Sequence, residues 1–340
     1  MIKDAIAAVL RGARLSAAES EAAIDEVMRG EATPAQIAGF AIALAFRGET
    51  AEELAGCVRA MRRHATRVPV GRPDAIDNCG TGGDGLSTFN ISTTAAFVAA
   101  GADCAVAKHG NRASSSRCGS AEVLEALGVA LDLPPAKTGQ AVDEIGIGFL
   151  YAPLLHGALR HAAAPRKELG VRTVFNLLGP MANPAGVRRQ VIGVARPEHV
   201  HLVAEALREL GSEHALVLHG AGGADELTLA GPNMACELKG GEIRELIIDA
   251  RELGLAYADI DALRGGDAAE NARISEGVLR GERGPRYDVV ALNAAAAIYI
   301  GGQAADLREG LRRAEVAIDS GAAAERLRSL IAFGKREMVG

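Results

Sequence analysis

The sequence predicts an α/β protein with a small all-helical N-terminal domain over residues 1–70. A larger α/β domain over residues 71–340 is expected to have a mainly parallel central sheet flanked by helices. Three observations support this prediction: residues 1–66 carry only helical patterns, short β-type runs alternate with helical runs from about residue 75, and the last 70 residues are helical again. Such alternation is typical of a parallel sheet covered by helices.

The helices of the N-terminal domain are expected to begin at capping boxes. In this motif a Ser or Thr and a Glu or Gln three residues later satisfy each other's free backbone N–H groups. The pairs are Ser16 with Glu19, Thr33 with Gln36, and Thr50 with Glu53. The segment RVPVGRP, residues 67–73, breaks the helical pattern and predicts a linker. We expect helices around residues 165–186 to join this helical domain.

The expected strands of the larger domain are short apolar runs between helical segments. They lie at residues 75–79, 104–108, 148–152, 190–195 and 214–220. The stretch 224–246 joins β-type runs by Gly-rich turns, which predicts a β-meander. The strongly apolar segment DVVALNAAAAIYIGG, residues 288–302, predicts a buried helix.

The composition argues against several classes of protein. The chain has 340 residues, of which 49% are apolar, and its net charge of -6 argues against a protein that neutralises a nucleic-acid backbone. None of the five cysteines belongs to a C-x-x-C pair, which suits a reducing compartment. The N-terminus has no secretory signal pattern, and no apolar run reaches the roughly 18 residues of a membrane span. We therefore expect a cytoplasmic protein that binds neither membrane nor nucleic acid.

The stretch NCGTGGDGLSTFNIST, residues 78–93, contains the pattern G-x-G-x-x-G at residues 80–85. A dinucleotide fingerprint requires a helix at the third glycine and an acidic residue at the end of the next strand. Here a loop continues to about Ser92, and the next strand ends in Lys108 and His109. These departures disfavour a nicotinamide site. The dense backbone and hydroxyl donors before a helix instead favour the oxygens of a phosphate group.

A second donor-rich loop follows the next expected strand, in KHGNRASSSRCGS, residues 108–120. Lys108 and Arg112 are fixed cations, Asn111 offers an amide, and three serines precede the next helix. Both loops lie at carboxyl ends of expected strands, where open α/β sheets form ligand crevices. Together the two loops predict a site for a polyphosphate, although a solvated charged turn remains the alternative for each loop alone.

These two loops resemble the phosphoribosyl-pyrophosphate (PRPP) loops of the anthranilate phosphoribosyltransferase family. The resemblance continues through residues 149–186, through GADELTL at 223–229 and through 288–302, and it covers essentially the whole chain. It implies transfer of the phosphoribosyl group of PRPP to the amine of anthranilate, with release of pyrophosphate, in tryptophan biosynthesis. It also implies Mg²⁺ as cofactor, two ions per monomer, and a homodimer.

The resemblance further implies which residues bind each group. PRPP would contact Gly80, Gly83, Asp84, Thr88, Asn90, Ile91, Ser92, Thr93, Lys108, His109, Gly110, Asn111, Arg112, Ala113, Ser114, Ser115, Ser116 and Ser120. Anthranilate would contact Gly80, Asn111 and Arg166. The metal would be held by Ser92, Asp225 and Glu226. Gly157 departs from the family pattern, in which a bulkier residue is expected, and bears on the shape of the acceptor pocket.

The chemistry of the transfer requires residues of these types. The ribose ring becomes cationic while the leaving pyrophosphate gains charge, so metal, Lys and backbone donors should stabilise the departing polyanion. Mg²⁺ prefers oxygen ligands, which the adjacent Asp225 and Glu226 provide. The planar guanidinium of Arg166 suits a bidentate pair with the anthranilate carboxylate. His109 and His156 are candidate neighbours of the amine, but no residue is assigned as general base.

Two other functions remain open from the residues. A pyrimidine nucleoside phosphorylase shares the fold but carries a different lysine loop, without KHGNR. A nucleic-acid-binding relative without transferase activity would be expected to show a cationic groove and aromatic stacking platforms. The acidic net charge and the 3% aromatic content disfavour that relative.

Overall fold

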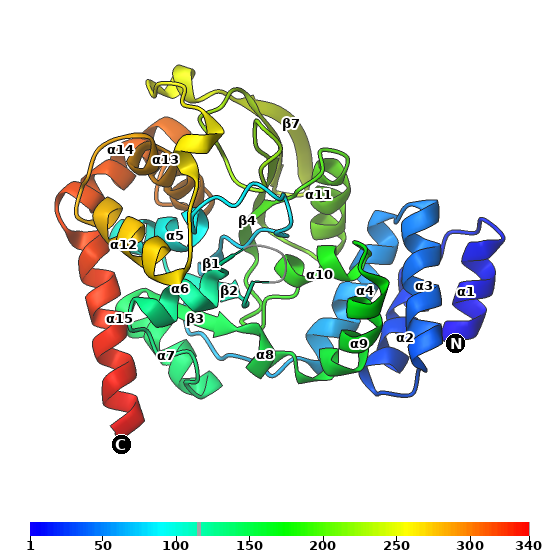
Figure 1. The fold of residues 1–340 in the computed structure, drawn as a ribbon. Helices are drawn as coiled ribbons and strands as arrows, with labels where there is room; N and C mark the ends of the chain where they lie inside the picture. The colour runs from blue at the N-terminus through cyan, green and yellow to red at the C-terminus, as the bar shows by residue number, and fades with distance from the viewer. Residues whose placement is uncertain (114–116, 340) are drawn as a thin grey trace.

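The computed structural model describes residues 1–113 and 117–339. Four helices form the N-terminal bundle, and Figure 1 shows them grouped to one side of the sheet. They are α1 (Ile2–Leu10), α2 (Ala17–Met28), α3 (Pro34–Arg47) and α4 (Ala51–His64). The three predicted capping boxes are present at the starts of α2, α3 and α4, so these helix starts were predicted correctly.

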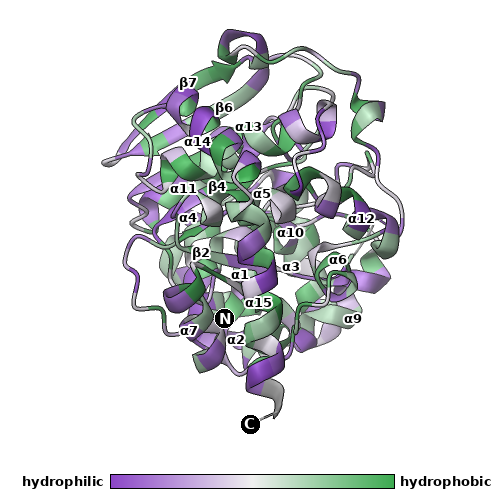
Figure 2. Ribbon diagram, turned by 90° about the vertical axis from the view of Figure 1, so that its left-hand side faces the viewer, coloured by the Kyte–Doolittle hydropathy of each residue, from purple (hydrophilic) through white to green (hydrophobic). Residues whose placement is uncertain are grey.

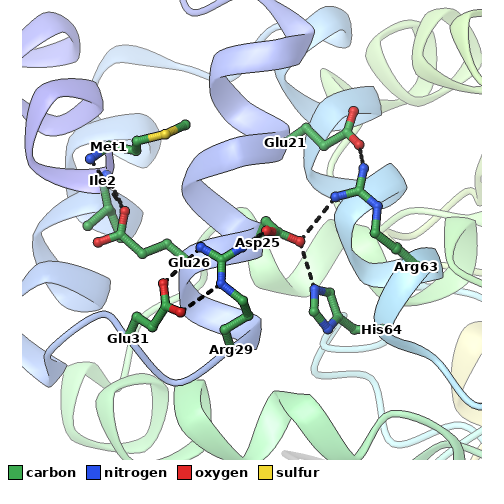
Figure 3. Close-up of polar contacts among 9 residues, drawn as sticks. All are labelled: Met1, Ile2, Glu21, Asp25, Glu26, Arg29, Glu31, Arg63 and His64. Atoms are coloured by element: carbon green, nitrogen blue, oxygen red, sulfur yellow. Dashed lines mark hydrogen bonds and ion pairs between the residues drawn. The ribbon is translucent and has the colours of Figure 1, made fainter.

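Charged side chains tie α1, α2 and α4 together (Figure 3). The Asp25 carboxylate of α2 lies 2.7 Å from His64 Nε2 and accepts a hydrogen bond of 3.1 Å from Arg63, both at the end of α4. The backbone N–H of Ile2 donates to the Glu26 carboxylate at 2.9 Å, which fixes the start of α1 against α2.

Seven strands form one sheet in the order β3-β2-β1-β4-β5-β6-β7. They are β1 (Ile76–Asp77), β2 (Val106–Gly110), β3 (Ile147–Tyr151), β4 (Arg189–Gly193), β5 (His214–His219), β6 (Asn233–Lys239) and β7 (Glu242–Ile248). Strands β1 to β5 pair in parallel, while β6 pairs antiparallel with β5 and β7 pairs antiparallel with β6. The sheet is therefore mixed and mostly parallel, as predicted, and the expected meander lies at β5–β6–β7.

One β-type run within the predicted meander is not a strand. Residues 225–229 are irregular, because the backbone N–H and C=O of Leu227 bond to the side-chain amide of Asn293 at 3.1 and 2.8 Å instead of to a neighbouring strand. Asn293 belongs to a helix 66 residues away, so a local pattern could not reveal this substitute for strand pairing.

Helices cover both faces of the sheet. Those that follow the bundle are α5 (Ile91–Gly101), α6 (Ser120–Ala126), α7 (Pro135–Ile145), α8 (Ala152–Leu155), α9 (Arg160–Leu169), α10 (Phe175–Met181), α11 (His199–Glu209), α12 (Ala268–Leu279), α13 (Pro285–Ile300), α14 (Leu307–Asp319) and α15 (Ala322–Val339). Short 3₁₀ turns lie at η1 (Gly157–Leu159), η2 (Ala250–Leu253) and η3 (Ile260–Leu263). In the part of the chain that the structure describes, none of these helices is long and apolar enough to cross a bilayer.

Two large apolar clusters lie on the two faces of the sheet. One packs α5, α12, α13, α14 and α15 against one face, and α13 is buried along most of its length, as predicted. The other joins the bundle helices to α10, α11 and the opposite face of β4, β5 and β6. In Figure 2 the surface helices are banded in purple and green, as expected for helices with one buried side.

Candidate active site

A recess opens at the carboxyl ends of the central strands, where the loops after β1, β4 and β5 meet. It is lined by Asn78, Gly80, Ser92, Val191, Gly193, Leu218, Asp225, Glu226 and Asn293. These residues come from segments that are far apart in the chain. The crevice lies where a parallel sheet exposes its strand ends, as the spacing of the two predicted loops indicated.

The acidic pair at Asp225 and Glu226 is held by backbone donors. The Asp225 carboxylate accepts the N–H of Gly82 at 2.5 Å, and the Glu226 carboxylate accepts the N–H of Ser92 at 3.1 Å. Ser92 lies in the first turn of α5, so Glu226 faces the amino end of a helix. Position 193 at the end of β4 requires glycine, because a Cβ atom there would collide with the Asp225 carbonyl. These contacts place both carboxylates beside the glycine loop.

The carboxylates of this recess are crowded, and their pKa values show it. Burial raises the pKa of Asp225 to about 8, and the nearby charges of Glu226 and Asp84 act in the same direction. Burial also raises the pKa of Glu226 to about 7, against the lowering effect of Lys108. One oxygen of Asp84, Oδ2, is buried and has no hydrogen-bond partner among the described residues. Three neighbouring carboxylates, one of which has an unsatisfied oxygen, fit a hard divalent cation that prefers oxygen ligands, such as Mg²⁺.

Lys108 is buried at the end of β2 and reaches back toward β1. Its ammonium donates to the backbone oxygen and to Oδ1 of Asn78, both at 3.2 Å. The amide of Asn78 in turn donates to the Ser92 carbonyl at 2.8 Å. Asn78 thus links the lysine to the first turn of α5, a role that its position before the glycine loop did not reveal.

A second buried network supports the base of this site. Asp77 accepts hydrogen bonds from the backbone N–H of His109 at 3.1 Å and from the amide of Asn183 at 2.8 Å. Burial raises the pKa of Asp77 to about 6, although the ammonium of Lys108 lowers it. The network fixes the start of the second loop against the first, and sequence analysis had not identified Asp77 or Asn183.

The glycine loop is anchored from the far end of the chain. The Phe89 N–H donates to the Leu263 carbonyl and the Gly265 N–H donates to the Ser87 carbonyl, both at 2.9 Å. The amide of Asn271 donates to Asn90 Oδ1 at 2.9 Å. Thr88, a predicted ligand, lies in an isolated bridge with Arg264. The segment around residues 263–271 therefore sets the conformation of a loop that lies far before it in the sequence.

The second loop folds back on its own helix. The hydroxyl of Ser120 accepts the Asn111 N–H at 3.2 Å and donates to the Asn111 carbonyl at 3.1 Å. The guanidinium of Arg112 forms a two-pronged pair with Glu125 at 2.7 Å and donates to the Tyr151 hydroxyl at 2.9 Å. The predicted ligands Ser114, Ser115 and Ser116 lie outside the described residues.

Two buried histidines pack together below the second loop. The ring centroids of His109 and His156 are 5.0 Å apart. Burial lowers the pKa of His109 to about 3 and that of His156 to about 4, so both rings are neutral at neutral pH. Their Nε2 atoms have no hydrogen-bond partner among the described residues.

Arg166, the predicted carboxylate ligand, lies on α9. Its guanidinium is half-buried, 5.6 Å above the ring of Phe175, and burial lowers its pKa. No acidic side chain of the described chain pairs with it. The helix that follows, α10, lies between the bundle and the sheet (Figure 1). Gly157, the departure from the family pattern, is exposed in η1.

Arg172 is a cation of this region that sequence analysis missed. Its guanidinium lies over the backbone of Gly83, where a Cβ atom would overlap it, and the charges of Asp225 and Asp84 act on it. It is half-buried, and burial lowers its pKa. No recognised motif marks its position in the sequence, because the approach to Gly83 arises only in the folded chain.

The chain matches known proteins over nearly its whole length. The model of the glycosyl transferase family's helical bundle domain matches residues 3–65, and the model of that family's a/b domain matches residues 72–324. The anthranilate phosphoribosyltransferase of Pelotomaculum thermopropionicum is 50% identical over 333 residues, which are 98% of this chain and 96% of that protein. The chain belongs to the anthranilate phosphoribosyltransferase family. The family predicted from the two loops is thereby confirmed.

Solved structures of the family agree with the fold. The anthranilate phosphoribosyltransferase (TrpD) from Thermus thermophilus is 46% identical and has a TM-score of 0.93. The match covers 98% of this chain and 99% of that chain. The Saccharomyces cerevisiae member, solved in complex with PRPP and Mg, is 27% identical with a TM-score of 0.90 and 98% of each chain covered. The same yeast protein in complex with 4-fluoroanthranilate is 26% identical, with a TM-score of 0.88 and 98% of each chain covered.

Proposed function

We propose that the recess at the strand ends is the catalytic site of an anthranilate phosphoribosyltransferase acting in tryptophan biosynthesis. The reaction forms a bond between the anthranilate nitrogen and C1 of ribose, and it breaks the bond between C1 and pyrophosphate. The amine loses one proton, which passes to solvent. The proposal rests on one arrangement: Asp225 and Glu226 face the glycine loop and the amino end of α5, with buried Lys108 linked to that helix through Asn78.

The proposed PRPP site combines the amino end of a helix, an ammonium group and two loops. The hydroxyl groups of Ser92 and Thr93 in the first turn of α5, together with the positive end of the helix dipole, would face phosphate oxygens, while the N–H of Ser92 stays bonded to Glu226. The ammonium of Lys108 would balance the charge that develops on pyrophosphate. Gly80 and Gly83 leave room for Asp225 and Arg172 beside the first loop, and Asn111 and Arg112 of the second loop would contact the phosphates of the ligand.

The crowded carboxylates fit Mg²⁺ as cofactor. Asp225 and Glu226 would hold it, with Ser92 beside Glu226 and Asp84 facing the substrate phosphates. Bound Mg²⁺ would offset the charge of the pyrophosphate as it leaves. A single Mg²⁺ takes one or two protein carboxylates and completes its coordination with substrate oxygens and waters. Three carboxylates gather here: Asp225 and Glu226, whose pKa values are raised by burial, and Asp84, whose Oδ2 has no hydrogen-bond partner among the described residues. This number of ligands supports two ions per monomer.

The proposed acceptor site lies toward α9 and α10. Arg166 has no acidic partner among the described residues and is held over Phe175, so its fork is available to a carboxylate. Asn111 and Gly80 would contact the same ligand from the two loops. The neutral rings of His109 and His156 would line this side without competing as cations for the carboxylate. No general base is assigned, because the neutral aryl amine is already nucleophilic.

We also propose the domain division and a homodimer. Residues 1–70, with α9 and α10 packed on them, would form the helical domain, and residues 71–340 the PRPP-binding domain. The bundle carries large exposed apolar side chains: Phe46 is 93% exposed, Leu10 is 73% exposed and Ile42 is 40% exposed. Ile42 and Phe46 are one turn apart on α3, on which α1 packs, so a second copy could cover this face.

The test is an activity assay with the purified chain. Loss of anthranilate fluorescence should require PRPP and Mg²⁺ together, and pyrophosphate should form in equal amount. Phosphorolysis of a pyrimidine nucleoside without anthranilate turnover would instead favour the nucleoside phosphorylase alternative. Tight binding of a nucleic acid with no turnover of either substrate would favour the relative that lacks transferase activity.

A further inference from the structure

Three metal-binding side chain types converge on the sheet face that packs against α11, outside the recess. Cys236 Sγ of β6 lies 3.9 Å from His201 Nδ1 of α11, and a carboxylate oxygen of Glu245 of β7 lies 3.4 Å from the same nitrogen. All three ligand atoms lie within 4.8 Å of one another. Tetrahedral Zn²⁺ places its N, O and S ligands roughly 3.3–3.8 Å apart, so only small side-chain adjustments separate this cluster from that geometry.

The backbone fixes two of these ligands in advance. Cys236 and Glu245 are direct partners in the antiparallel ladder of β6 and β7, so their side chains leave the same face of the sheet side by side. Apolar residues of α11 pack in one cluster with Cys236, and this packing holds His201 above the two strands. The three positions therefore come from rigid elements, as a binding site requires.

A fourth residue lies behind the imidazole. Glu205, one turn after His201 on α11, lies with its carboxylate 3.6 Å from His201 Nε2. Carboxylates flank both ring nitrogens, since Glu245 lies 3.4 Å from Nδ1; when an ion is held by Nδ1 and Glu245, Nε2 keeps its proton beside Glu205. A carboxylate behind a ligating histidine is the usual support for a metal-bound imidazole.

We propose that His201 Nδ1, Cys236 Sγ and the Glu245 carboxylate bind a divalent transition metal ion, with Zn²⁺ as the best fit. Thiolate and imidazole select a borderline metal of this kind over Mg²⁺, which prefers oxygen ligands alone. Binding forms the metal–sulfur bond and releases the thiol proton to solvent. His201 and Glu245 are 51% and 77% exposed, so the ion reaches the site freely and water completes its coordination.

The site would act on the fold and not on the transfer. None of its residues lines the recess that contains Asp225 and Glu226. The ion would join α11 to β6 and β7 and would stabilise the folded chain relative to the unfolded one. Burial and the charge of Glu245 raise the pKa of Cys236 to about 11, so without metal its thiol stays protonated and is a poor nucleophile at neutral pH.

The test uses the full chain, freed of metal by a chelator and then held in excess Mg²⁺ to occupy the carboxylates of the recess. Titration with Co²⁺ should give a thiolate-to-cobalt charge-transfer absorption that saturates at one ion per chain, and Zn²⁺ should displace it. Cys236→Ser should abolish the absorption. Glu205→Gln should weaken Zn²⁺ binding by about tenfold to a hundredfold, as for other residues that orient a ligating histidine.

Two exposed positions of β7 keep the test independent of folding. Glu245→Gln should weaken Zn²⁺ binding at least about tenfold, whereas Glu242→Gln should not change it, because strand residues three apart point to opposite faces. Absence of the charge-transfer absorption in the wild-type chain, or its persistence in Cys236→Ser, would overturn the proposal. Equal Zn²⁺ affinity in Glu245→Gln and the wild-type chain would overturn it as well.

Discussion

The Glu226 carboxylate accepts a hydrogen bond of 3.1 Å from the backbone N–H of Ser92, in the first turn of α5. These residues are 134 positions apart in the sequence. Their contact places a carboxylate, a helix amino end and the glycine loop around one recess. A helix amino end attracts anions, whereas two adjacent carboxylates attract cations, so the contact brings together the donors for a phosphate and the ligands for its metal.

Removal of the Glu226 carboxylate should abolish turnover without unfolding the chain. Glu226→Ala removes one ligand of the proposed metal site, and excess chelator acting on the wild-type chain should have the same effect. Anthranilate fluorescence measures the activity and far-ultraviolet circular dichroism measures the fold. Glu252→Gln, at an exposed position, serves as the control. Full activity in excess chelator would exclude the metal role.

Loss of the Lys108 ammonium should weaken the use of PRPP. Lys108→Met keeps the buried chain of methylenes but removes a charge-assisted interaction of roughly 1.5–3 kcal/mol with phosphate oxygens. The KM for PRPP should therefore rise by about tenfold to a hundredfold, and the KM for anthranilate should change much less. Lys137→Met is the matched control, because this half-buried lysine of α7 pairs with Glu337 and lies outside the recess. A change confined to the anthranilate KM would move Lys108 to the acceptor side.

Arg166 should determine the KM for anthranilate. Arg166→Ala removes a bidentate pair with the carboxylate, worth roughly 1.5–3 kcal/mol, and should raise the anthranilate KM by about tenfold to a hundredfold. Arg166→Lys should recover only part of this loss, because an ammonium keeps the charge but not the planar fork. Steady-state kinetics with each substrate varied in turn measures both effects. If only the KM for PRPP changes, Asn111 becomes the next candidate for binding the anthranilate carboxylate.

The buried His156 should make the folded chain sensitive to acid. Its pKa is lowered from 6.5 to about 4 by burial, so below pH 6.5 the unfolded chain binds a proton that the folded chain does not. Its contribution to stability is therefore complete above pH 6.5 and is lost as the pH falls toward 4, by about 1.4 kcal/mol for each unit.

Denaturant unfolding at several pH values measures this loss. His156→Gln should lose less stability than the wild-type chain between pH 6.5 and pH 4, because glutamine does not titrate. Equal slopes for the wild-type chain and His156→Gln would show that His156 titrates normally in the folded chain.

The exposed apolar face of α3 should mediate the proposed homodimer. Phe46→Glu places a charge on a side chain that is 93% exposed, so it should not destabilise the monomer, but a charge buried between two copies would be costly. Sedimentation equilibrium should show a dimer for the wild-type chain and a monomer for Phe46→Glu. Val316→Glu, at a 65% exposed position of α14, should remain dimeric. A wild-type monomer would exclude the dimer.

The sequence by itself determined the features that depend on neighbours along the chain. The capping boxes at Ser16, Thr33 and Thr50 located three helix starts, because the hydrogen bonds of a capping box span only three residues. The five parallel strands and the buried helix α13 followed from local patterns of apolar residues. The two loops were long and specific enough to identify the family, which the 50% identical relative confirmed.

Only the tertiary structure decided the contacts between distant segments. Asn293 replaces strand pairing at Leu227, Arg172 lies over Gly83, and Asn271 anchors Asn90, yet nothing near these residues in the sequence predicts their partners. The convergence of His201, Cys236 and Glu245 depends likewise on the register of β6 with β7 and on the packing of α11. Polar groups that are buried on folding must be hydrogen-bonded, and the tertiary structure determines which partners are within reach.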